Sequence, residues 1–522
     1  MPSIELLDTT LRDGAQGEGI EHSLSDKRKI AQALEALGVP LIEGGNPYGN
    51  PKDAAFFEEM RQEPFLRTAK LVPFGSTCRR GSIPGEDKGI LTLLSTEQPV
   101  VSLFGKTNLL HVTDVLQVSP GENLRMIEES VAYLTAQGRR VLFDGEHFFD
   151  GCVRDKDYAF ETLRAAARGG ADMLVLCDTN GGTLPEDMSA RLCEARAAIP
   201  GVKFGIHCHD DMGLAVAGSI LCVQAGAVQV QGTIGGVGER CGNANLCTLI
   251  PTLQLKLGYE VLPVGSLPLL TETAHTIAEI MNLQPSSRSP YVGYSAFAHK
   301  GGMHMDGVSK NTMTFEHIPP ESVGNRRRFV LSEHAGRSGV YLRLKRLLPD
   351  LESREDPRVK QVTERLKRRE FRGYTYESAD GSFDLMALDT LGLRKSFFQV
   401  LDFHVISGGK AGEESAQAYI KISVDGREEI NAAEGDGPLN ALDNAMGKAL
   451  LVFYPAMKKV SLRDFKVRVL DREGTASEVR VLIESTDGKN IWTTVGVSSN
   501  IIHACFRALC DSVEYFLTFF QE

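Results

Sequence analysis

Two histidines separated by one residue, His207 and His209 in the segment GIHCHDDMG, have a spacing that suits metal binding. On a strand, side chains two positions apart share a face, so both imidazoles can reach one ion. Asp13 and Asn243, which follow other apolar runs, could add a carboxylate and an amide oxygen. Such a set, with open water positions, suits a divalent cation acting as a Lewis acid: Mn²⁺, Mg²⁺, Co²⁺ or Zn²⁺. The alternative is an HxH pair with a purely structural role.

Eight short apolar runs in the first half of the chain are spaced at roughly 30 residues, the length of a βα unit. Amphipathic stretches lie between them, such as Ser25–Leu37, which begins with a cap-type serine. This alternation predicts an α/β fold, a (β/α)₈ TIM barrel. A doubly wound open sheet is the main alternative. That fold would require a glycine-rich loop after the first strand, where this chain has TTLRDGAQ. The runs are Ile4–Leu7, Val39–Ile42, Ala69–Phe74, Val100–Phe104, Arg140–Phe143, Met173–Leu176, Val202–Ile206 and Val228–Gln231.

Polar residues able to do chemistry follow nearly every one of these runs. In a barrel of this kind the carboxyl ends of all strands lie at one rim, where active sites form. The sequence therefore predicts one site at this rim. The residues are Arg12, Asp13, Glu43, Asn46, Arg79, Lys106, Glu146, Asp178, Thr179, Asn180, His207, His209, Thr233, Glu239 and Asn243.

The remainder of the chain changes character twice. A loop-rich and then charged helical stretch follows the barrel, and from about residue 395 apolar residues alternate with polar ones. Two similar halves follow there, each with strands, a small-residue loop and a helix, and the first half has expected strands at 397–407 and 416–426. This weak repeat predicts an α+β domain with pseudo-two-fold symmetry. We therefore expect a barrel over 1–275, linker subdomains over 276–394 and a C-terminal domain over 395–522.

Composition excludes several classes of protein. The 57 basic and 68 acidic residues give a net charge of −11, which argues against nucleic acid or an anionic membrane as a general partner. The longest apolar runs are too short for a membrane span, which needs about 18 residues. None of the ten cysteines forms a CxxC pair, which is typical of a reducing compartment. With no secretory signal at the N-terminus, the expected location is the cytoplasm.

Three motifs carry a resemblance to a known family. DTTLRDGAQ over Asp8–Gln16, HCHDD over His207–Asp211 and GERCGNA over Gly238–Ala244 resemble the signatures of the DRE-TIM metallolyases. These barrel enzymes include isopropylmalate, homocitrate and citramalate synthases. The C-terminal halves resemble the allosteric regulatory domain of isopropylmalate and citramalate synthases, including the AEGDGP turn at Ala433–Pro438. The resemblance therefore runs essentially from end to end.

The resemblance implies an acyltransferase that condenses acetyl-CoA with a small 2-keto acid on a divalent metal, and then hydrolyses the thioester. It implies metal binding by Asp13, His207 and His209, with Asn243 as their partner or as a water-mediated ligand. Arg12 would neutralise the developing alkoxide, where a fixed cation contributes several kcal/mol. Thr179 in CDTNGG would bind the substrate carboxylate, and Glu146 in FDGEHFFDG would act as the acid or base.

The linker carries one more expected catalytic residue. His304 in HKGGMHMDGV resembles a family histidine that a partner subunit delivers to the active site, so the resemblance implies a homodimer. Some relatives have a catalytic tyrosine near the position of Phe315, and its hydroxyl is absent here. The resemblance therefore implies that His304 carries more of the acid–base work.

The nearest resemblance is to a branch of citramalate synthases, which use pyruvate to form (R)-citramalate in threonine-independent isoleucine biosynthesis. A 2-isopropylmalate synthase, which uses 2-oxoisovalerate in leucine biosynthesis, is the alternative, because one or two methylenes change affinity by only about 1–3 kcal/mol. The regulatory domain would bind isoleucine or leucine. Its expected effector residues are Gly435, Asp436 and Gly437, in a turn before a helix N-terminus that can hold a carboxylate.

Two other classes deserve comparison. A biotin-dependent carboxyltransferase shares the barrel and an HxH metal site, and Ala456–Lys459 resembles part of a biotin-attachment motif. That segment borders a helix far from the C-terminus, which argues against biotin attachment. A non-catalytic amino-acid-binding regulator is the other alternative, and the intact Arg12, Asp13 and Glu146 argue against it.

Overall fold

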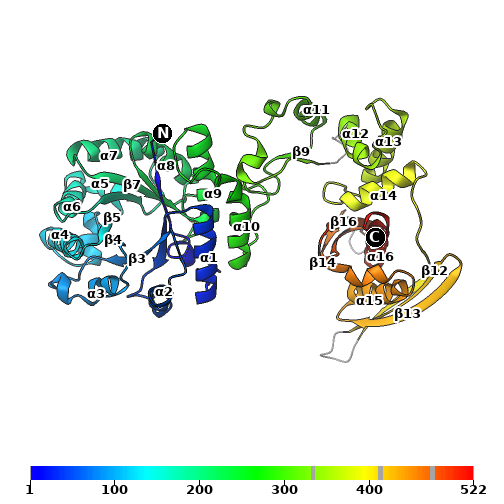
Figure 1. Cartoon of the computed structure of the whole chain (residues 1–522), viewed down its shortest axis with the longest axis horizontal. Helices are drawn as coiled ribbons and strands as arrows, with labels where there is room; N and C mark the ends of the chain where they lie inside the picture. The colour runs from blue at the N-terminus through cyan, green and yellow to red at the C-terminus, as the bar shows by residue number, and fades with distance from the viewer. Residues whose placement is uncertain (1, 331–335, 409–414, 471–476, 521–522) are drawn as a thin grey trace. The chain divides into compact units, whose positions relative to one another are not determined.

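The computed structural model describes residues 2–330, 336–408, 415–470 and 477–520. The chain divides into two compact units. The first comprises Met1–Phe297 and Pro319–Arg326, and the second comprises Ala298–Ile318 and Arg327–Glu522. Figure 1 shows the first unit in blue to green and most of the second in yellow to red.

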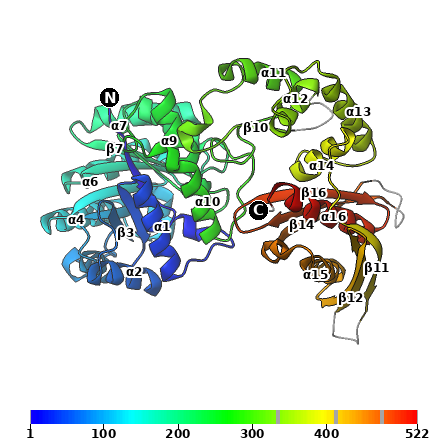
Figure 2. The same cartoon turned by 45° about the vertical axis from the view of Figure 1, so that its right-hand side comes forward.

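The first unit is a closed barrel of eight parallel strands in sequential order, with β1 paired to β8. This confirms the predicted TIM barrel and excludes the open doubly wound sheet. Figure 2 shows helices around the outside of the strands. The strands are β1 (Glu5–Asp8), β2 (Leu41–Gly45), β3 (Lys70–Ser76), β4 (Val100–Lys106), β5 (Arg140–Glu146), β6 (Met173–Asp178), β7 (Lys203–Cys208) and β8 (Gln229–Gly232).

Helix α1 shows how local sequence sets the boundaries of these elements. Its N-cap is Ser23, not the predicted Ser25, because Ser23 and Asp26 form a reciprocal capping box. It ends at Gly38, whose φ of 95° closes the helix in the left-handed conformation. The helices of this unit are α1 (Leu24–Leu37), α2 (Pro51–Gln62), α3 (Lys88–Ser95), α4 (Pro120–Ala136), α5 (Phe148–Arg154), α6 (Lys156–Arg168), α7 (Pro185–Ala198), α8 (Ala215–Gln224), α9 (Leu246–Pro251) and α10 (Leu270–Ile280).

The second unit begins with a short parallel pair of strands and four helices. The pair is β9 (Ala298–His299) with β10 (Arg328–Phe329). The helices are α11 (Gly302–Lys310), α12 (Gly336–Leu347), α13 (Pro357–Phe371) and α14 (Asp380–Thr390). Buried residues of these helices, including Val340, Leu366 and Phe383, form one core with Val495 and Val497 of the C-terminal domain.

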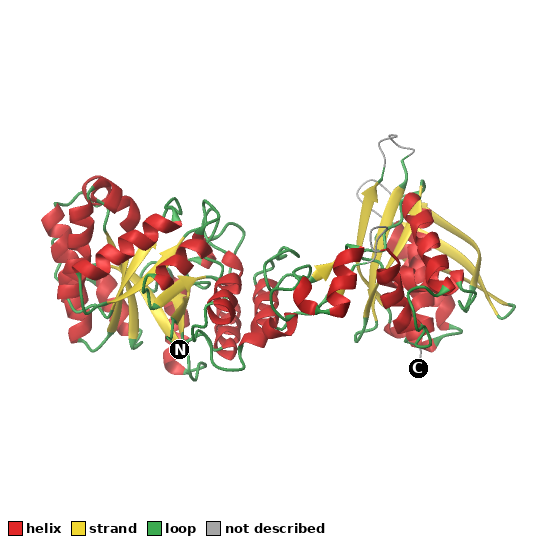
Figure 3. Ribbon diagram, turned by 90° about the horizontal axis from the view of Figure 1, so that it is seen from above, coloured by secondary structure: helices red, strands yellow, loops and turns green. Residues whose placement is uncertain are grey.

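The C-terminal domain contains two βββα repeats, which confirms the predicted α+β duplication. Figure 3 shows its strands in yellow and its helices in red. The first is β11 (Gln399–Ser407), β12 (Ala416–Val424), β13 (Arg427–Gly435) and α15 (Pro438–Leu451). The second is β14 (Ser461–Val469), β15 (Val479–Thr486), β16 (Ile491–Ser498) and α16 (Ile501–Phe519). Strand β13 was not expected, because its sequence REEINAAEG is mostly polar and largely exposed at a sheet edge. Among the described residues, no helix is long and apolar enough to cross a bilayer.

Candidate active site and metal centre

The carboxyl ends of the barrel strands surround a cavity of about 310 Å³. Eight of the predicted rim residues line it, and Asn243 lies directly beside Asp13. Six others are not among its lining residues: Glu43, Arg79, Lys106, Asp178, Asn180 and Thr233. The lining side chains are Arg12, Asp13, Gln16, Asn46, Phe74, Phe104, Asp144, Glu146, Cys177, Thr179, His207, His209, Glu239 and Arg240. The rim position is the one that the strand-end pattern predicts.

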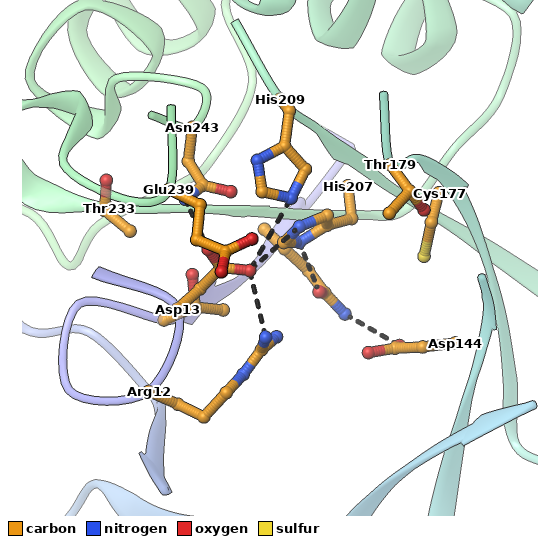
Figure 4. Close-up of polar contacts among 12 residues, drawn as sticks. Arg12, Asp13, Asp144, Cys177, Thr179, His207, His209, Thr233, Glu239 and Asn243 are labelled. Carbon is orange, nitrogen blue, oxygen red and sulfur yellow. Dashed lines mark hydrogen bonds and ion pairs between the residues drawn. The ribbon is translucent and has the colours of Figure 1, made fainter. Parts of the chain in front are cut away.

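Asp13, His207 and His209 form a buried cluster whose potential ligand atoms all lie within 4.8 Å of one another. The Oδ2 of Asp13 is 3.5 Å from the Nε2 of His207 and 3.7 Å from the Nε2 of His209. Figure 4 shows both rings turned toward this carboxylate. Cys208, between the histidines, contacts Met188 on the other face of the strand, away from the cluster. The alternation along β7 therefore directs both imidazoles to one point.

Charges and unpaired atoms in this cluster fit a divalent cation. Burial alone would raise the pKa of Asp13, but Arg12 and the two imidazoles hold it well below its ordinary value. Burial and the nearby His207 lower the pKa of His209 to about 4, so its ring is neutral at pH 7. The Oδ1 of Asn243 is buried and has no hydrogen-bond partner in the described part of the chain. Such an orphaned acceptor beside a carboxylate suits a metal and its bound water.

Arg12 is held rigidly at the edge of the cluster. Its Nε donates to the Oε2 of Glu43 at 2.5 Å, and its Nη1 donates to the Oδ2 of Asp13 at 2.9 Å. The guanidinium carbon also lies 3.8 Å from the centre of the Phe74 ring. Burial would lower the pKa of Arg12, but Glu43 and Asp13 raise it above its ordinary value. Arg12 is thus a permanent, preorganised cation at the cavity wall.

Glu146, the last residue of β5, is the register partner of Lys106, the last residue of β4. Their charged ends form an ion pair, and both side chains are only partly exposed. The backbone carbonyl of Glu146 also accepts hydrogen bonds from the amide and hydroxyl of Thr107. The sequence predicts that Lys106 lies at the rim. It does not predict that Glu146 is its partner, because the register between two strands cannot be derived from one sequence.

The backbone near Thr179 orients its hydroxyl. The amide of His147 donates to the Oγ1 of Thr179 at 2.8 Å. His147 has a φ of 59°, a left-handed conformation that a non-glycine residue seldom adopts. Because the oxygen already accepts this hydrogen bond, the hydroxyl proton of Thr179 is available to a ligand carboxylate.

His304 and the expected effector turn lie in the second unit. His304, in α11, stacks on Phe315 with ring centroids 4.1 Å apart. Gly435 ends β13, and Gly437 is the N-cap of α15. The amide of Asp436 donates to the Oδ1 of Asn440 at 3.3 Å. The roles of these residues stay predictions.

The structure adds cavity residues that sequence reasoning missed. Phe74 and Phe104 stack with ring centroids 5.0 Å apart and form an aromatic wall. Asp144, on β5, is buried, and this burial raises its pKa to about 6. Phe74, Phe104 and Asp144 lie on barrel strands and line the cavity. Side chains alternate between the inside and the outside of a barrel strand, so this alternation could have identified them as inward-facing residues.

Comparison with known proteins assigns the family. The model of the HMGL-like family matches residues 3–277. The chain belongs to the HMGL-like family. Models of the homocitrate synthase post-HMGL domain-like region and of the LeuA allosteric (dimerisation) domain match residues 291–372 and 377–517. These matches confirm the resemblance to the DRE-TIM metallolyases.

Full-length relatives refine this assignment. The HMGL-like chain is 47% identical to the (R)-citramalate synthase of Aquifex aeolicus, over 98% of this chain and 97% of that protein. It is also 47% identical to the (R)-citramalate synthase of Synechocystis sp., over 98% of this chain and 96% of the relative. The 2-isopropylmalate synthase of Pyrococcus furiosus is 30% identical, over 98% of each chain. Ala456–Lys459 lie within the segment matched by the LeuA domain model, which removes the basis for biotin attachment.

Proposed function

We propose that this HMGL-like chain condenses acetyl-CoA with pyruvate and water to give (R)-citramalate and CoA. The observation that carries the proposal is the near full-length identity of 44–47% to (R)-citramalate synthases. The stacked wall of Phe74 and Phe104 supports a small 2-keto acid, because it narrows the cavity beside the metal cluster. The alternative, 2-isopropylmalate synthesis, has the weaker support of relatives about 30% identical.

Asp13, His207 and His209 would hold the divalent metal, with Asn243 as its partner. When bound, the metal supplies Lewis acidity toward the keto and carboxylate oxygens of the 2-keto acid. The hydroxyl of Thr179 donates a hydrogen bond to the substrate carboxylate. Arg12 stabilises the negative charge that develops on the keto oxygen during attack, without needing to reorganise.

Glu146 removes a proton from the methyl group of acetyl-CoA. The electron pair left on that carbon attacks the keto carbon of pyruvate, and the keto oxygen becomes a hydroxyl as it takes up a proton. Lys106 keeps the Glu146 carboxylate at the cavity rim through their ion pair. His304 would assist proton transfer while water cleaves the thioester and releases CoA.

Regulation belongs to the C-terminal domain in this proposal. The LeuA allosteric (dimerisation) domain match supports an amino-acid effector and a homodimer. Isoleucine is the expected inhibitor of an enzyme that feeds isoleucine synthesis, and leucine is the alternative. The turn Gly435–Gly437 presents the N-terminus of α15, where free N–H groups favour a carboxylate.

A thiol-release assay tests the proposal. The purified chain, supplied with Mn²⁺ or Mg²⁺ and acetyl-CoA, is given pyruvate, 2-oxobutyrate, 2-oxoisovalerate or 2-oxoglutarate in turn. We expect the highest kcat/KM with pyruvate, with citramalate identified by mass spectrometry. Preference for 2-oxoisovalerate would support isopropylmalate synthesis instead, and release with none of the four acids would refute the condensation reaction.

A further inference from the structure

A chain of buried polar side chains runs through the barrel interior from one of the proposed metal ligands. His207 and Gln231 are register partners on β7 and β8, and the Nδ1 of His207 is 3.0 Å from the Oε1 of Gln231. The Nε2 of Gln231 donates to the Oδ1 of Asp144 at 3.3 Å and to the Oε1 of Gln229 at 3.4 Å. Both glutamines are fully buried. Figure 4 shows the dashed connection that reaches Asp144.

The same chain continues to the opposite end of the barrel. Gln229 is the register partner of Glu5 on β1, and its Nε2 donates to the Oε2 of Glu5 at 2.7 Å. Arg140, at the start of β5, donates through its two terminal nitrogens to both carboxylate oxygens of Glu5, at 2.7 and 2.8 Å. The chain therefore ends at the ion pair of Glu5 and Arg140, in which both carboxylate oxygens of Glu5 accept hydrogen bonds.

This arrangement determines the direction of every hydrogen bond in the chain. An ionised carboxylate only accepts, so Gln229 must turn its NH₂ toward Glu5 and its oxygen toward Gln231. Asp144 likewise accepts from Gln231. Because two acceptors surround the NH₂ of Gln231, its oxygen faces His207. That oxygen can only accept, so the Nδ1 of His207 must carry the proton.

A proton on Nδ1 leaves the Nε2 of His207 with a lone pair directed at the metal cluster, 3.5 Å from the Oδ2 of Asp13. If the Gln231 amide were reversed, its NH₂ would face Nδ1 and the proton would sit on Nε2, where it blocks a cation. The Nδ1 of His209 has no hydrogen-bond partner among the described residues. The hydrogen-bond chain of the barrel interior therefore supports His207 and not His209.

We propose that Gln231 is a positioning residue that selects the metal-binding tautomer of His207, oriented by Asp144 and Gln229. This inference rests on the metal site of the proposed function. A hydrogen bond to the second ring nitrogen of a metal-binding histidine typically changes metal affinity by about 10–100-fold. The buried chain therefore links metal affinity to residues that never touch the ion.

Mn²⁺ binding to the full-length, metal-stripped chain tests this inference. The variant Gln231→Met removes the acceptor while nearly keeping the side-chain length. We expect a Kd for Mn²⁺ raised about tenfold or more, measured by electron paramagnetic resonance of free Mn²⁺. Gln98→Met is the matched control, because Gln98 is also buried in the barrel unit and its side-chain Nε2 donates to the backbone carbonyl of Thr96. It should bind Mn²⁺ like the wild type.

A shorter amide provides the second test. The variant Gln231→Asn withdraws the acceptor from His207 by one methylene and leaves a polar amide in the barrel interior, so its Kd for Mn²⁺ should also rise about tenfold or more. Mn²⁺ binding as tight as wild type by Gln231→Met would overturn the inference. If that variant does not fold, wild-type Mn²⁺ affinity in a folded Gln231→Asn protein overturns it instead. A wild-type chain that binds no Mn²⁺ would refute the proposed metal site itself.

Discussion

Lys106 and Glu146 occupy matching register positions on β4 and β5 and form an ion pair at the rim of the barrel. In the proposed reaction Glu146 is the base, and Lys106 holds the Glu146 carboxylate in position for the methyl group of acetyl-CoA. Glu146→Gln should lower kcat by about a hundredfold or more in the thiol-release assay. Lys106→Met should lower kcat with a smaller effect on the KM of pyruvate, and Lys106→Arg should restore most of it.

Lys203→Met is a suitable control for the Lys106 variants. Lys203 begins β7 and pairs with Asp172 at 3.1 Å, at the end of the strand opposite the site. Its loss should leave kcat unchanged. Equal losses in the Lys106 and Lys203 variants would mean that Lys106 acts only on barrel stability.

His207→Ala should abolish metal binding and activity while the chain stays folded. Removal of one imidazole leaves Asp13 and His209 as a weaker site, and the alanine adds no strain to β7. Plasma mass spectrometry measures the metal content of the variant, and the far-ultraviolet circular dichroism spectrum shows whether it is folded. A folded variant with the metal content and activity of the wild type would contradict the ligand assignment.

Phe104→Ala should shift substrate preference toward larger keto acids. Loss of one ring from the Phe74–Phe104 stack opens space beside the site, and a pocket change of one or two carbons alters discrimination by about 1–3 kcal/mol. We expect the ratio of kcat/KM for 2-oxoisovalerate over pyruvate to rise at least tenfold. A ratio that stays constant would show that this wall does not contact the substrate side chain.

Much of this site was predictable because its residues obey local rules. The HxH spacing of His207 and His209 and their place after a strand predict a shared face, whatever the rest of the fold. The role of Gln231 and the partner of Lys106 could not be recognised in the same way, although Lys106 itself was predicted at the rim. Their partners come from neighbouring strands, and only the register of the closed barrel brings His207 beside Gln231 or Glu146 beside Lys106. Strand β13 was missed because an exposed edge strand needs no apolar alternation.

Asp8→Asn should stabilise the protein at high pH. Burial raises the pKa of Asp8 to about 7, although Thr10 donates to it through its amide and hydroxyl. Below the ordinary carboxyl pKa both states are protonated and the substitution changes little. As the pH rises toward 7, unfolding releases the proton, so wild-type stability falls. At pH 8 the gain has an upper limit of about 4 kcal/mol.

Thermal unfolding from pH 4 to pH 8 measures this effect. The difference in Tm between Asp8→Asn and wild type should grow with pH and level off above 7. Asp187→Asn serves as control, because Asp187 is exposed on α7. A Tm difference for Asp8→Asn that is independent of pH would contradict the raised pKa.

Truncation after residue 394 should expose a core as well as remove the regulatory repeats. Val495 and Val497 of β16 pack against Phe383 of α14. The hydroxyl of Ser382 accepts from the amide of Val495 and donates to Asp511. A chain ending at 394 would lose all of these partners, so it should bind a hydrophobic dye and aggregate.

A chain that ends near 372 also loses α14, whose Phe383 shares a core with Val340 of α12 and Leu366 of α13, so it should bind at least as much dye as the longer truncation. Amino-acid inhibition should be absent from both. If isoleucine or leucine still inhibits either truncated protein, the effector site lies outside the C-terminal domain. A well-folded, dye-free 1–394 protein would show that α14 does not need the C-terminal sheets, and that the helices from α11 to α14 form a core of their own.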